Sequence, residues 1–477
     1  MPDNKILPFS CLPDWVHPAE ELELMYRTAL KEQLRKIVVL DDDPTGIQTV
    51  HGVSVYTDWT EESIRSGFAE ESPMFFILTN SRSMTGAQTE SVHREIAHRV
   101  CRVSRETGRD FILISRSDST LRGHWPLETK ILAEEVTRSL GKCYDGEVIM
   151  PFFREGGRFT FDNIHYVKED DQLTPAGKTE FAKDKMFCYT NSHIGKWCQE
   201  KTGGEYAAED CIYIDLADIR ALHVEKIAQQ LMQASGFQKV IVNAVCYADV
   251  KVFCIAYIRA MQAGKEFIFR TAAAWTRILS GISDRPLLSH EELVPRTDAG
   301  GIILVGSHVN KTTQQLDELR RSGMPIHFME FDATLVTTPD GLQKEAGRIV
   351  SWAESLIRQG QTVAIYTTRK RIDLTDLNSE QQLEMSVAIS DAVTSIIGRL
   401  TVRPAFILAK GGITSSDVGT KALRVKKATV LGQIMPGVPV WLAGEESKFP
   451  GLPYVIFPGN VGDTTTLTRA VRTLMGM

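Results

Sequence analysis

Three adjacent carboxylates are the most distinctive chemical feature of this sequence. Asp41, Asp42 and Asp43 follow the apolar run 37–40 and precede a Pro-Thr-Gly turn sequence. Such a run is typical of a buried strand, and open α/β sheets bind ligands where their strands end. Because neighbouring negative charges repel one another, we expect a cation, a hydroxyl group or a basic partner to use them. A solvated turn is the alternative interpretation.

A second polar segment, residues 115–123, follows the apolar run 111–114 and combines hydroxyl groups, a carboxylate and two guanidinium groups. Arginine can bind a carboxylate through two parallel hydrogen bonds, and aspartate can orient or deprotonate an alcohol. The segment therefore favours a site for a polyhydroxylated acid. Ser119 or Thr120 could instead cap the following helix, and Arg122 could form a surface ion pair.

The C-terminal half places glycine after its apolar runs. Gly411 and Gly412 follow the run 406–408 and precede Thr414 and Ser415, where a helix is predicted to begin. Backbone N–H groups at a helix N-terminus attract anions, and glycine lets a phosphate approach closely. Residues 306–307 and 459–462 repeat the arrangement. No Walker or dinucleotide-binding pattern is present, and tight turns are the structural alternative.

Apolar runs that alternate with helical segments predict an α/β fold with two domains, each a mainly parallel sheet flanked by helices. A chain of 477 residues is too long for a single core. The polar, proline-containing segment 279–301 predicts the domain boundary. We expect a helical N-terminal segment over residues 1–34 and domains over 35–295 and 296–477, with the active site in the cleft between them.

Composition narrows the function classes. The net charge is −6 and no extended basic run is present, so we expect no nucleic-acid partner. The sequence contains neither a leader-like N-terminus nor an apolar stretch long enough for a membrane span. Eight cysteines without a C-x-x-C pair argue against a zinc cage and a disulfide framework. These features favour a cytoplasmic protein.

Five short motifs occur in the order found in the four-carbon acid sugar kinase family, and the chain resembles a longer member of it. They are DDDPTG at residues 41–46, DSTLRG at 118–123, GG-x-TS at 411–415, PGVP at 436–439 and GN-x-G at 459–462. The resemblance implies an N-terminal domain for threonate, erythronate or a 2-oxo relative. It also implies a C-terminal domain for ATP with Mg²⁺, phosphate transfer to the terminal hydroxyl of the acid, and a dimer.

The resemblance and the strand-end loops together name the candidate site residues. The substrate side comprises Asp42, Asp43, Thr45, Gly46, Ser81, Arg82, Arg116, Asp118, Ser119, Thr120, Arg122 and Gly123. The nucleotide side comprises Ser307, Gly411, Gly412, Thr414, Ser415, Gly459, Asn460 and Gly462. No metal ligand is assigned.

Phosphoryl transfer depends mainly on positioning and charge neutralisation. We predict that Asp118 is the general base, with Asp42 as the second candidate, and that Arg82, Arg116 or Arg122 holds the substrate carboxylate. The three adjacent acids could equally bind a metal or the substrate hydroxyls.

The chain departs from the family pattern in several places. Arg116 stands where many members have lysine, Ile413 replaces an acidic residue, and Asp463 with the following threonines replaces an ending that contains an aromatic residue. Extra chain is expected around residues 162–201. These departures leave the choice of sugar acid open.

Two other function classes are compatible with parts of the sequence. A hydroxy-acid dehydrogenase would also combine α/β domains with arginines and carboxylates, but its dinucleotide fingerprint is missing. A non-catalytic sensor of sugar acids could keep the N-terminal site and lose the phosphate-binding loops. The glycine-bearing loops of the C-terminal half argue against this second class.

Overall fold

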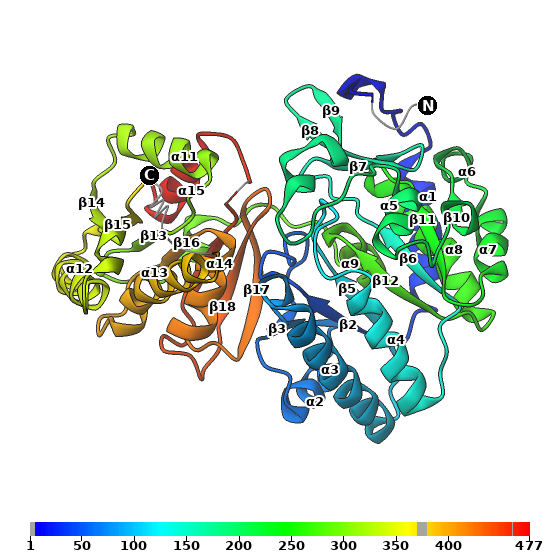
Figure 1. The fold of residues 1–477 in the computed structure, drawn as a ribbon, viewed down its shortest axis with the longest axis horizontal. Coiled ribbons are helices and arrows are strands. Elements are labelled where there is room, and N and C mark those ends of the chain that lie inside the picture. The colour runs from blue at the N-terminus through cyan, green and yellow to red at the C-terminus, as the bar shows by residue number, and fades with distance from the viewer. Residues whose placement is uncertain (1–4, 370–378, 460) are drawn as a thin grey trace. The chain divides into compact units, whose positions relative to one another are not determined.

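The computed structural model describes residues 5–369, 379–459 and 461–477, and it confirms the predicted α/β fold. The chain divides into two compact units, Met1–Asp284 and Arg285–Met477 (Figure 1). Each unit contains a mainly parallel sheet with helices packed against it. Asn460, which was predicted on the nucleotide side, lies outside the described residues.

The sheet of the first unit is parallel throughout. Its strands follow the order β10 (Ile212–Ile214), β11 (Gln238–Val242), β6 (Gly146–Met150), β12 (Phe267–Thr271), β5 (Phe111–Arg116), β2 (Lys36–Asp41), β4 (Met74–Leu78) and β3 (Ser54–Tyr56). The central strands β2, β4 and β5 are buried along their whole length, which explains their continuous apolar sequences.

Helices pack on this sheet and on one another. They are α1 (Ala19–Leu30), α2 (Glu61–Ala69), α3 (Gly86–Thr107), α4 (Leu127–Leu140), α5 (Ile194–Lys201), α6 (Leu216–Arg220), α7 (Val224–Gln233), α8 (Tyr247–Gln262) and α9 (Ala273–Ser280). Helices α3 and α4 lie side by side (Figure 1). A capping box of Thr85 and Gln88 begins α3, and Gly108, with φ at 65°, ends it.

A small antiparallel sheet forms a separate element of the first unit. Its order is β1 (Leu7–Pro8), β9 (Gln172–Pro175), β8 (Ile164–Glu169) and β7 (Arg158–Phe161). Two short 3-10 helices, η3 (Ala176–Lys178) and η4 (Glu180–Lys183), follow β9. The predicted extra chain, residues 162–201, therefore contains β8, β9, both 3-10 helices and α5.

The second unit has a mixed sheet. Its order is β17 (Lys427–Met435), β18 (Val438–Ala443), β19 (Pro453–Phe457), β16 (Ile407–Lys410), β13 (Ile302–Val305), β15 (Thr362–Thr367) and β14 (Ile326–Phe331). The strands from β19 to β14 run parallel, whereas β17, β18 and β19 pair antiparallel. The PGVP motif supplies the turn between β17 and β18, where Gly437 has φ at 76°.

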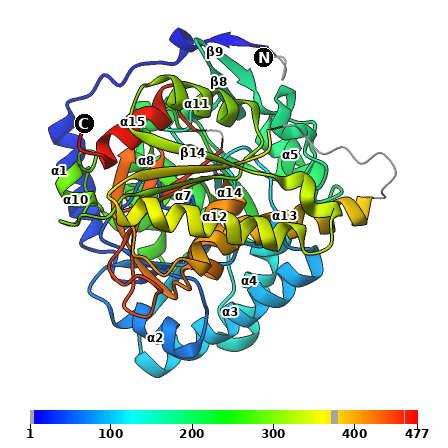
Figure 2. The same cartoon turned by 90° about the vertical axis from the view of Figure 1, so that its left-hand side faces the viewer.

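Helices pack on this second sheet as well. They are α10 (His290–Leu293), α11 (Asn310–Arg321), α12 (Gly341–Arg358), α13 (Ser379–Arg399), α14 (Gly412–Asp417) and α15 (Thr466–Leu474). Helices α12 and α13 contact each other (Figure 2), and side chains of α11 and α15 share a core with β13 and β19. Within the part of the chain that the structure describes, no helix is both long and apolar enough to span a bilayer.

Candidate functional site

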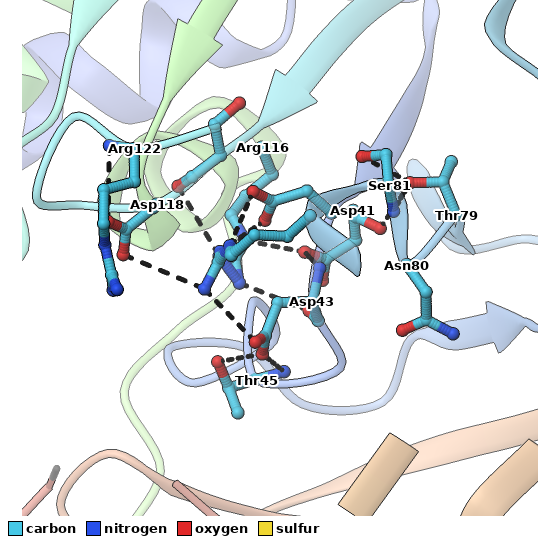
Figure 3. Close-up of polar contacts among 12 residues, drawn as sticks. Asp41, Asp43, Thr45, Thr79, Asn80, Ser81, Arg116, Asp118 and Arg122 are labelled. Atoms are coloured by element: carbon cyan, nitrogen blue, oxygen red, sulfur yellow. Dashed lines mark hydrogen bonds and ion pairs between the residues drawn. The ribbon is translucent and has the colours of Figure 1, made fainter. Parts of the chain in front are cut away.

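The candidate site of the first unit lies at the carboxyl ends of β2, β4 and β5. Strand pairing places Asp41 opposite both Leu78 and Arg116, so the loops that follow these strands begin at the same edge of the sheet. We call the charged residues of these loops the carboxylate site (Figure 3). They are Asp41, Asp42, Asp43, Arg82, Arg116, Asp118 and Arg122.

Arg116 contacts all three of the adjacent acids. Its Nε lies 2.8 Å from Asp41 Oδ1, its Nη1 lies 3.6 Å from Asp42 Oδ1, and its Nη2 donates to the Asp43 carbonyl at 3.3 Å. Gly46 leaves the space that this arrangement needs. A Cβ at Gly46 would lie 1.9 Å from Arg116 Nε and 2.1 Å from Asp41 Oδ2. The glycine of the first motif is therefore required by the Asp41–Arg116 ion pair.

Arg82 binds the other two acids of the first motif. It donates to Asp42 through Nε at 3.0 Å and Nη2 at 2.6 Å, which is the bidentate geometry that favours arginine. Its Nη1 donates to Asp43 Oδ2 at 3.2 Å. The Thr45 backbone N–H and hydroxyl donate to Asp43 Oδ1 at 2.8 and 2.5 Å. Asp42 and Asp43 are thus already hydrogen-bonded by the chain itself.

Asp118 occupies the second loop of the site. Arg122 Nε donates to Asp118 Oδ2 at 2.8 Å, and the Thr120 hydroxyl donates to the same oxygen. Arg82 Nη1 lies 3.9 Å from Asp118 Oδ1, which connects the two loops. The second Asp118 oxygen has the weaker of these contacts and is the one better placed to accept a hydrogen bond from a ligand.

Buried side chains hold the backbone of this second loop. Arg270 Nη2, from β12, donates to the carbonyls of Asp118 and Arg122 at 3.2 Å each. His165 Nε2 donates to the Ser119 carbonyl at 2.7 Å, and Tyr189 donates to the Thr120 carbonyl at 2.6 Å. Burial lowers the pKa of His165 to about 3, so its ring is neutral. The loop is therefore fixed before any ligand arrives.

Burial raises the pKa values of two acids in the site. Asp41 reaches a pKa of about 7, because burial outweighs the opposing charge of Arg116 and Asp42 adds repulsion. Burial also raises the pKa of Asp42, against Arg82 and Arg116. Asp41 thus has a pKa near neutral pH, although it was not among the predicted catalytic residues.

The other two acids have lowered pKa values. Burial favours the neutral form of Asp43, but Arg82 and Arg116 outweigh it and lower the pKa. Burial also favours the neutral form of Asp118. The charges of Arg122 and Arg82 outweigh burial and hold the pKa of Asp118 well below its ordinary range. Asp118 is consequently ionised at neutral pH and is a weak base.

The raised pKa of Asp41 predicts a pH-dependent stability. Between its ordinary value of 3.8 and about 7, the native protein keeps a proton that the unfolded chain releases. The free energy of unfolding should therefore fall as pH rises, by up to about 1.4 kcal/mol per pH unit from this group. In urea titrations, the stability of the wild type relative to Asp41→Asn should decrease from pH 5 to pH 7. The exposed Asp171→Asn variant controls for the removal of a carboxylate, and a constant difference for Asp41→Asn would mean that Asp41 is ionised throughout.

The structure brings most of the predicted substrate-side residues together, with two exceptions. Ser81 Oγ donates to Glu128 Oε1 at 2.7 Å and accepts from Thr79, on the side of Asp41 away from Asp118 (Figure 3). Ser119 contributes its backbone carbonyl to the contact with His165 described above. Gly123 does lie at the site, because a Cβ there would be 3.5 Å from Asp42 Oδ2.

The second unit brings three loops together at the carboxyl ends of β13, β16 and β19. Pairing aligns Val305 with Lys410 and Lys410 with Phe457. A Cβ at Gly306 would lie 2.2 Å from Thr414 Oγ1, and one at Gly459 would lie 3.0 Å from Ser307 Oγ. Gly411 has φ at +129°, and its Cβ would lie 3.1 Å from Ser307 Cβ. We call Gly306, Ser307, Gly411, Thr414 and Gly459 the glycine site.

Lys410 directly precedes Gly411 of the glycine site, and it was not predicted as a site residue. Its carbonyl accepts from the N–H groups of Gly306 and Ser307 at 3.2 Å each, and its Nζ donates to the Pro458 carbonyl at 3.0 Å. It is 0% exposed, and none of the described carboxylates forms an ion pair with it. Burial lowers its pKa to about 7. A lysine inside an apolar run, directly before a glycine pair, is the signal that could have identified it.

Further side chains contact the glycine site, whereas some of the predicted residues make their contacts elsewhere. Thr312 Oγ1 donates to the Gly459 carbonyl at 3.1 Å, and Arg369 Nη1 donates to the Ser307 carbonyl at 2.7 Å. The Ser415 hydroxyl instead donates to the Ala409 carbonyl at 2.8 Å and is buried. Gly462 packs on α15, since a Cβ there would lie 2.4 Å from Thr466 Oγ1. Gly412 is the first residue of α14.

The residues that support the second loop of the carboxylate site could be predicted only in part from the sequence. Arg270 is a charged residue inside the otherwise apolar β12, and that contrast is a usable signal. His165 and Tyr189 carry no such signal. In the described parts of the chain, no three His, Cys, Asp or Glu side chains are grouped so that they could hold a metal ion.

Each of the two units matches a model of a known protein family. A family model for a sugar-binding N-terminal domain matches residues 37–279, and one for a nucleotide-binding C-terminal domain matches residues 302–467. No curated protein matches the chain by sequence.

Solved structures share the fold. A Haemophilus influenzae protein is 16% identical with a TM-score of 0.59, and the match covers 92% of this chain and 100% of that chain. A Salmonella typhimurium LT2 protein, provisionally named a tRNA synthase, is 17% identical with a TM-score of 0.63, covering 92% and 99% of the two chains. The two domain matches follow one another along the sequence and together span most of it. The chain therefore belongs to the four-carbon acid sugar kinase family.

Proposed function

We propose that this protein is an ATP-dependent kinase that phosphorylates the terminal hydroxyl of a four-carbon sugar acid of the threonate, erythronate or 2-oxo-tetronate type. The observation that carries the proposal is the complementary chemistry of its two sites. The sugar-binding domain contains a fixed set of carboxylates and guanidinium groups, and the nucleotide-binding domain contains a glycine site next to a buried lysine that none of the described carboxylates pairs with.

The carboxylate site fits a polyhydroxylated substrate. Carboxylate oxygens accept hydrogen bonds from hydroxyl groups, and Asp118 has an oxygen with only a long contact to Arg82. We propose that Asp118 accepts the hydrogen bond of the attacking hydroxyl. A weak base suffices, because the loose transition state of phosphoryl transfer depends more on alignment than on early proton removal.

The glycine site fits the phosphates of ATP. Gly306, Gly411 and Gly459 leave room where side chains would clash with Ser307 and Thr414, and bound phosphates would favour the charged form of the buried Lys410. Magnesium is expected to bind chiefly through the phosphates, since Mg²⁺ commonly uses few protein ligands and keeps several waters. It would neutralise charge on the phosphoryl group during transfer.

The direct experiment measures ATP consumption by the purified protein with a panel of threonates, erythronates and 2-oxo-tetronates. ³¹P NMR of the product should show a phosphomonoester on the terminal carbon. Binding of both ligands without ATP consumption would indicate a sensor. Failure to bind ATP, together with reduction of a nicotinamide cofactor, would indicate a dehydrogenase.

The nucleotide assignment makes a separate prediction for Gly411. Gly411→Ala places a side chain at φ +129° and 3.1 Å from Ser307 Cβ, so the loop should move and ADP affinity should fall at least about tenfold by isothermal calorimetry. Gly323→Ala is the matched control, because Gly323 also has a positive φ of +71° but a Cβ there meets nothing within 4 Å. Equal ADP affinity in both variants would remove Gly411 from the phosphate site.

A further inference from the structure

Arg158, the first residue of β7, is a charged side chain whose partners among the described residues are incomplete. Its Nη1 donates to the Gly156 carbonyl, whereas its Nε is buried without a hydrogen-bond partner. No carboxylate within the described residues forms an ion pair with it. Residue 158 as a whole is partly exposed, although its Nε is buried. A guanidinium shielded from water without a counter-ion is costly unless an anion completes its surroundings.

Arg158 lies next to the second loop of the carboxylate site. Its guanidinium lies over the ring of Phe181 at 5.4 Å from the centroid, and the guanidinium of Arg122 lies over the same ring at 5.1 Å. Burial lowers the pKa of Arg158. The next largest effects come from the charge of Asp118, which raises this pKa, and from the charge of Arg122, which lowers it. One aromatic ring therefore holds two cations at the site, an arrangement stabilised by cation–π attraction.

The other arginines of the site already have acidic partners. Arg82 uses its donors on Asp42 and Asp43, and Arg116 pairs with Asp41. Arg122 donates to Asp118 and lies 3.6 Å from Asp184. Each of these pairs reduces the charge that is available for an incoming anion.

Arg270 also forms no ion pair with an acid in the described part of the chain, but it is 0% exposed, and its guanidinium donates to two loop carbonyls. Arg158 is thus the arginine near Asp118 that combines an unpaired charge with access from solvent. We propose that Arg158, beside Arg122, binds the carboxylate of the substrate acid. This inference rests on the proposed function and identifies the group that distinguishes an acid from a neutral polyol.

The small antiparallel sheet would then set the specificity for acids. β7 carries Arg158, and the chain after β9 carries Phe181 and Asp184, which contact Arg122. Tyr189 follows and donates to the Thr120 carbonyl. The same segment that positions the loop of Asp118 therefore also supplies the proposed carboxylate ligand.

The test compares an acid with the polyol that lacks only the carboxylate. Arg158→Gln should lower kcat/KM for threonate or erythronate by about 10- to 100-fold, the usual effect of losing a hydrogen bond to a charged group. The low rate with threitol or erythritol should change less than about twofold. Arg158→Lys keeps the charge and should recover part of the loss. Arg154→Gln, which changes an exposed arginine in the turn before β7, is the matched control and should behave as wild type.

Binding without ATP separates this inference from the kinase proposal. Calorimetric titration with threonate and erythronate should show the same loss of affinity in Arg158→Gln, even if no phosphate transfer is detected. An equal loss for acid and polyol, or unchanged acid binding in a variant with the wild-type melting temperature, would overturn the assignment. A wild-type protein that binds these acids through Arg158 but never consumes ATP would contradict only the kinase proposal. A wild-type protein that binds none of the acids would overturn both.

Discussion

Asp118→Asn is expected to lower kcat for phosphorylation of the sugar acid by about 10²–10⁴-fold, with little change in the affinity for ADP. Asparagine keeps the shape of the side chain, but its amide cannot accept the proton of the attacking hydroxyl. The change also removes the negative charge that Arg122 and Arg82 face at 2.8 and 3.9 Å. Because buried side chains hold the loop backbone, the variant should retain its fold, with a lower melting temperature that reports the loss of the Asp118–Arg122 ion pair.

Asp42→Asn tests whether the roles are assigned correctly. Asp42 is bound bidentately by Arg82, so its replacement should act mainly through substrate affinity. A large loss of kcat at Asp42 and a pure loss of affinity at Asp118 would exchange the two roles. Near-normal kcat in both variants would mean that alignment and magnesium carry the reaction alone. The exposed Asp171→Asn variant controls for a general effect of removing charge.

Local sequence was sufficient to predict which strand ends come together at the two candidate sites. The acids of residues 41–43 and the segment 115–123 each follow a buried apolar run, and parallel strands bring such strand ends to one edge of a sheet. The same reasoning located Ser307, Gly411 and Gly459 in the second unit. Both inferences needed only the order of apolar and polar residues along the chain.

The pairing of charges within the site could not be predicted in the same way. Several acids and arginines lie within a few residues of one another, and their sequence allows many combinations. Which arginine meets which acid depends on backbone positions after each strand, and the resulting pKa values depend on burial. This is why the sequence did not indicate that the pKa of Asp41 lies near 7.

The long-range contacts that hold the second loop of the carboxylate site could not be predicted from the sequence either. Arg270 reaches Asp118 across a separation of 152 residues, and Tyr189 reaches Thr120 across 69. Such contacts arise from the order of strands in the sheet and from the placement of the small antiparallel sheet. The hydroxyls of Ser81 and Ser415 were both predicted at the sites, and in the structure they donate to Glu128 and to the Ala409 carbonyl.

The glycine of the first motif gives the second large effect. Gly46→Ala should lower the free energy of unfolding by about 3–5 kcal/mol, because its Cβ would lie 1.9 Å from Arg116 Nε and 2.1 Å from Asp41 Oδ2. Either the loop moves or the buried Asp41–Arg116 pair separates, and separation leaves two charges unpaired away from water. We expect kcat/KM for the sugar acid to fall at least about 100-fold, since Arg116 also contacts Asp42 and Asp43.

The matched control is Gly86→Ala, in which the new Cβ meets Leu127 Cδ2 at an ordinary 3.8 Å at the start of α3. Urea unfolding and steady-state kinetics should show a near-neutral effect for this control. ADP affinity should stay at the wild-type value in Gly46→Ala, provided that the second unit remains folded. Wild-type stability and activity in Gly46→Ala would show that the Asp41–Arg116 pair can shift without cost. The motif glycine would then serve a close approach of the substrate, and the ion pair would not be what excludes a side chain at this position.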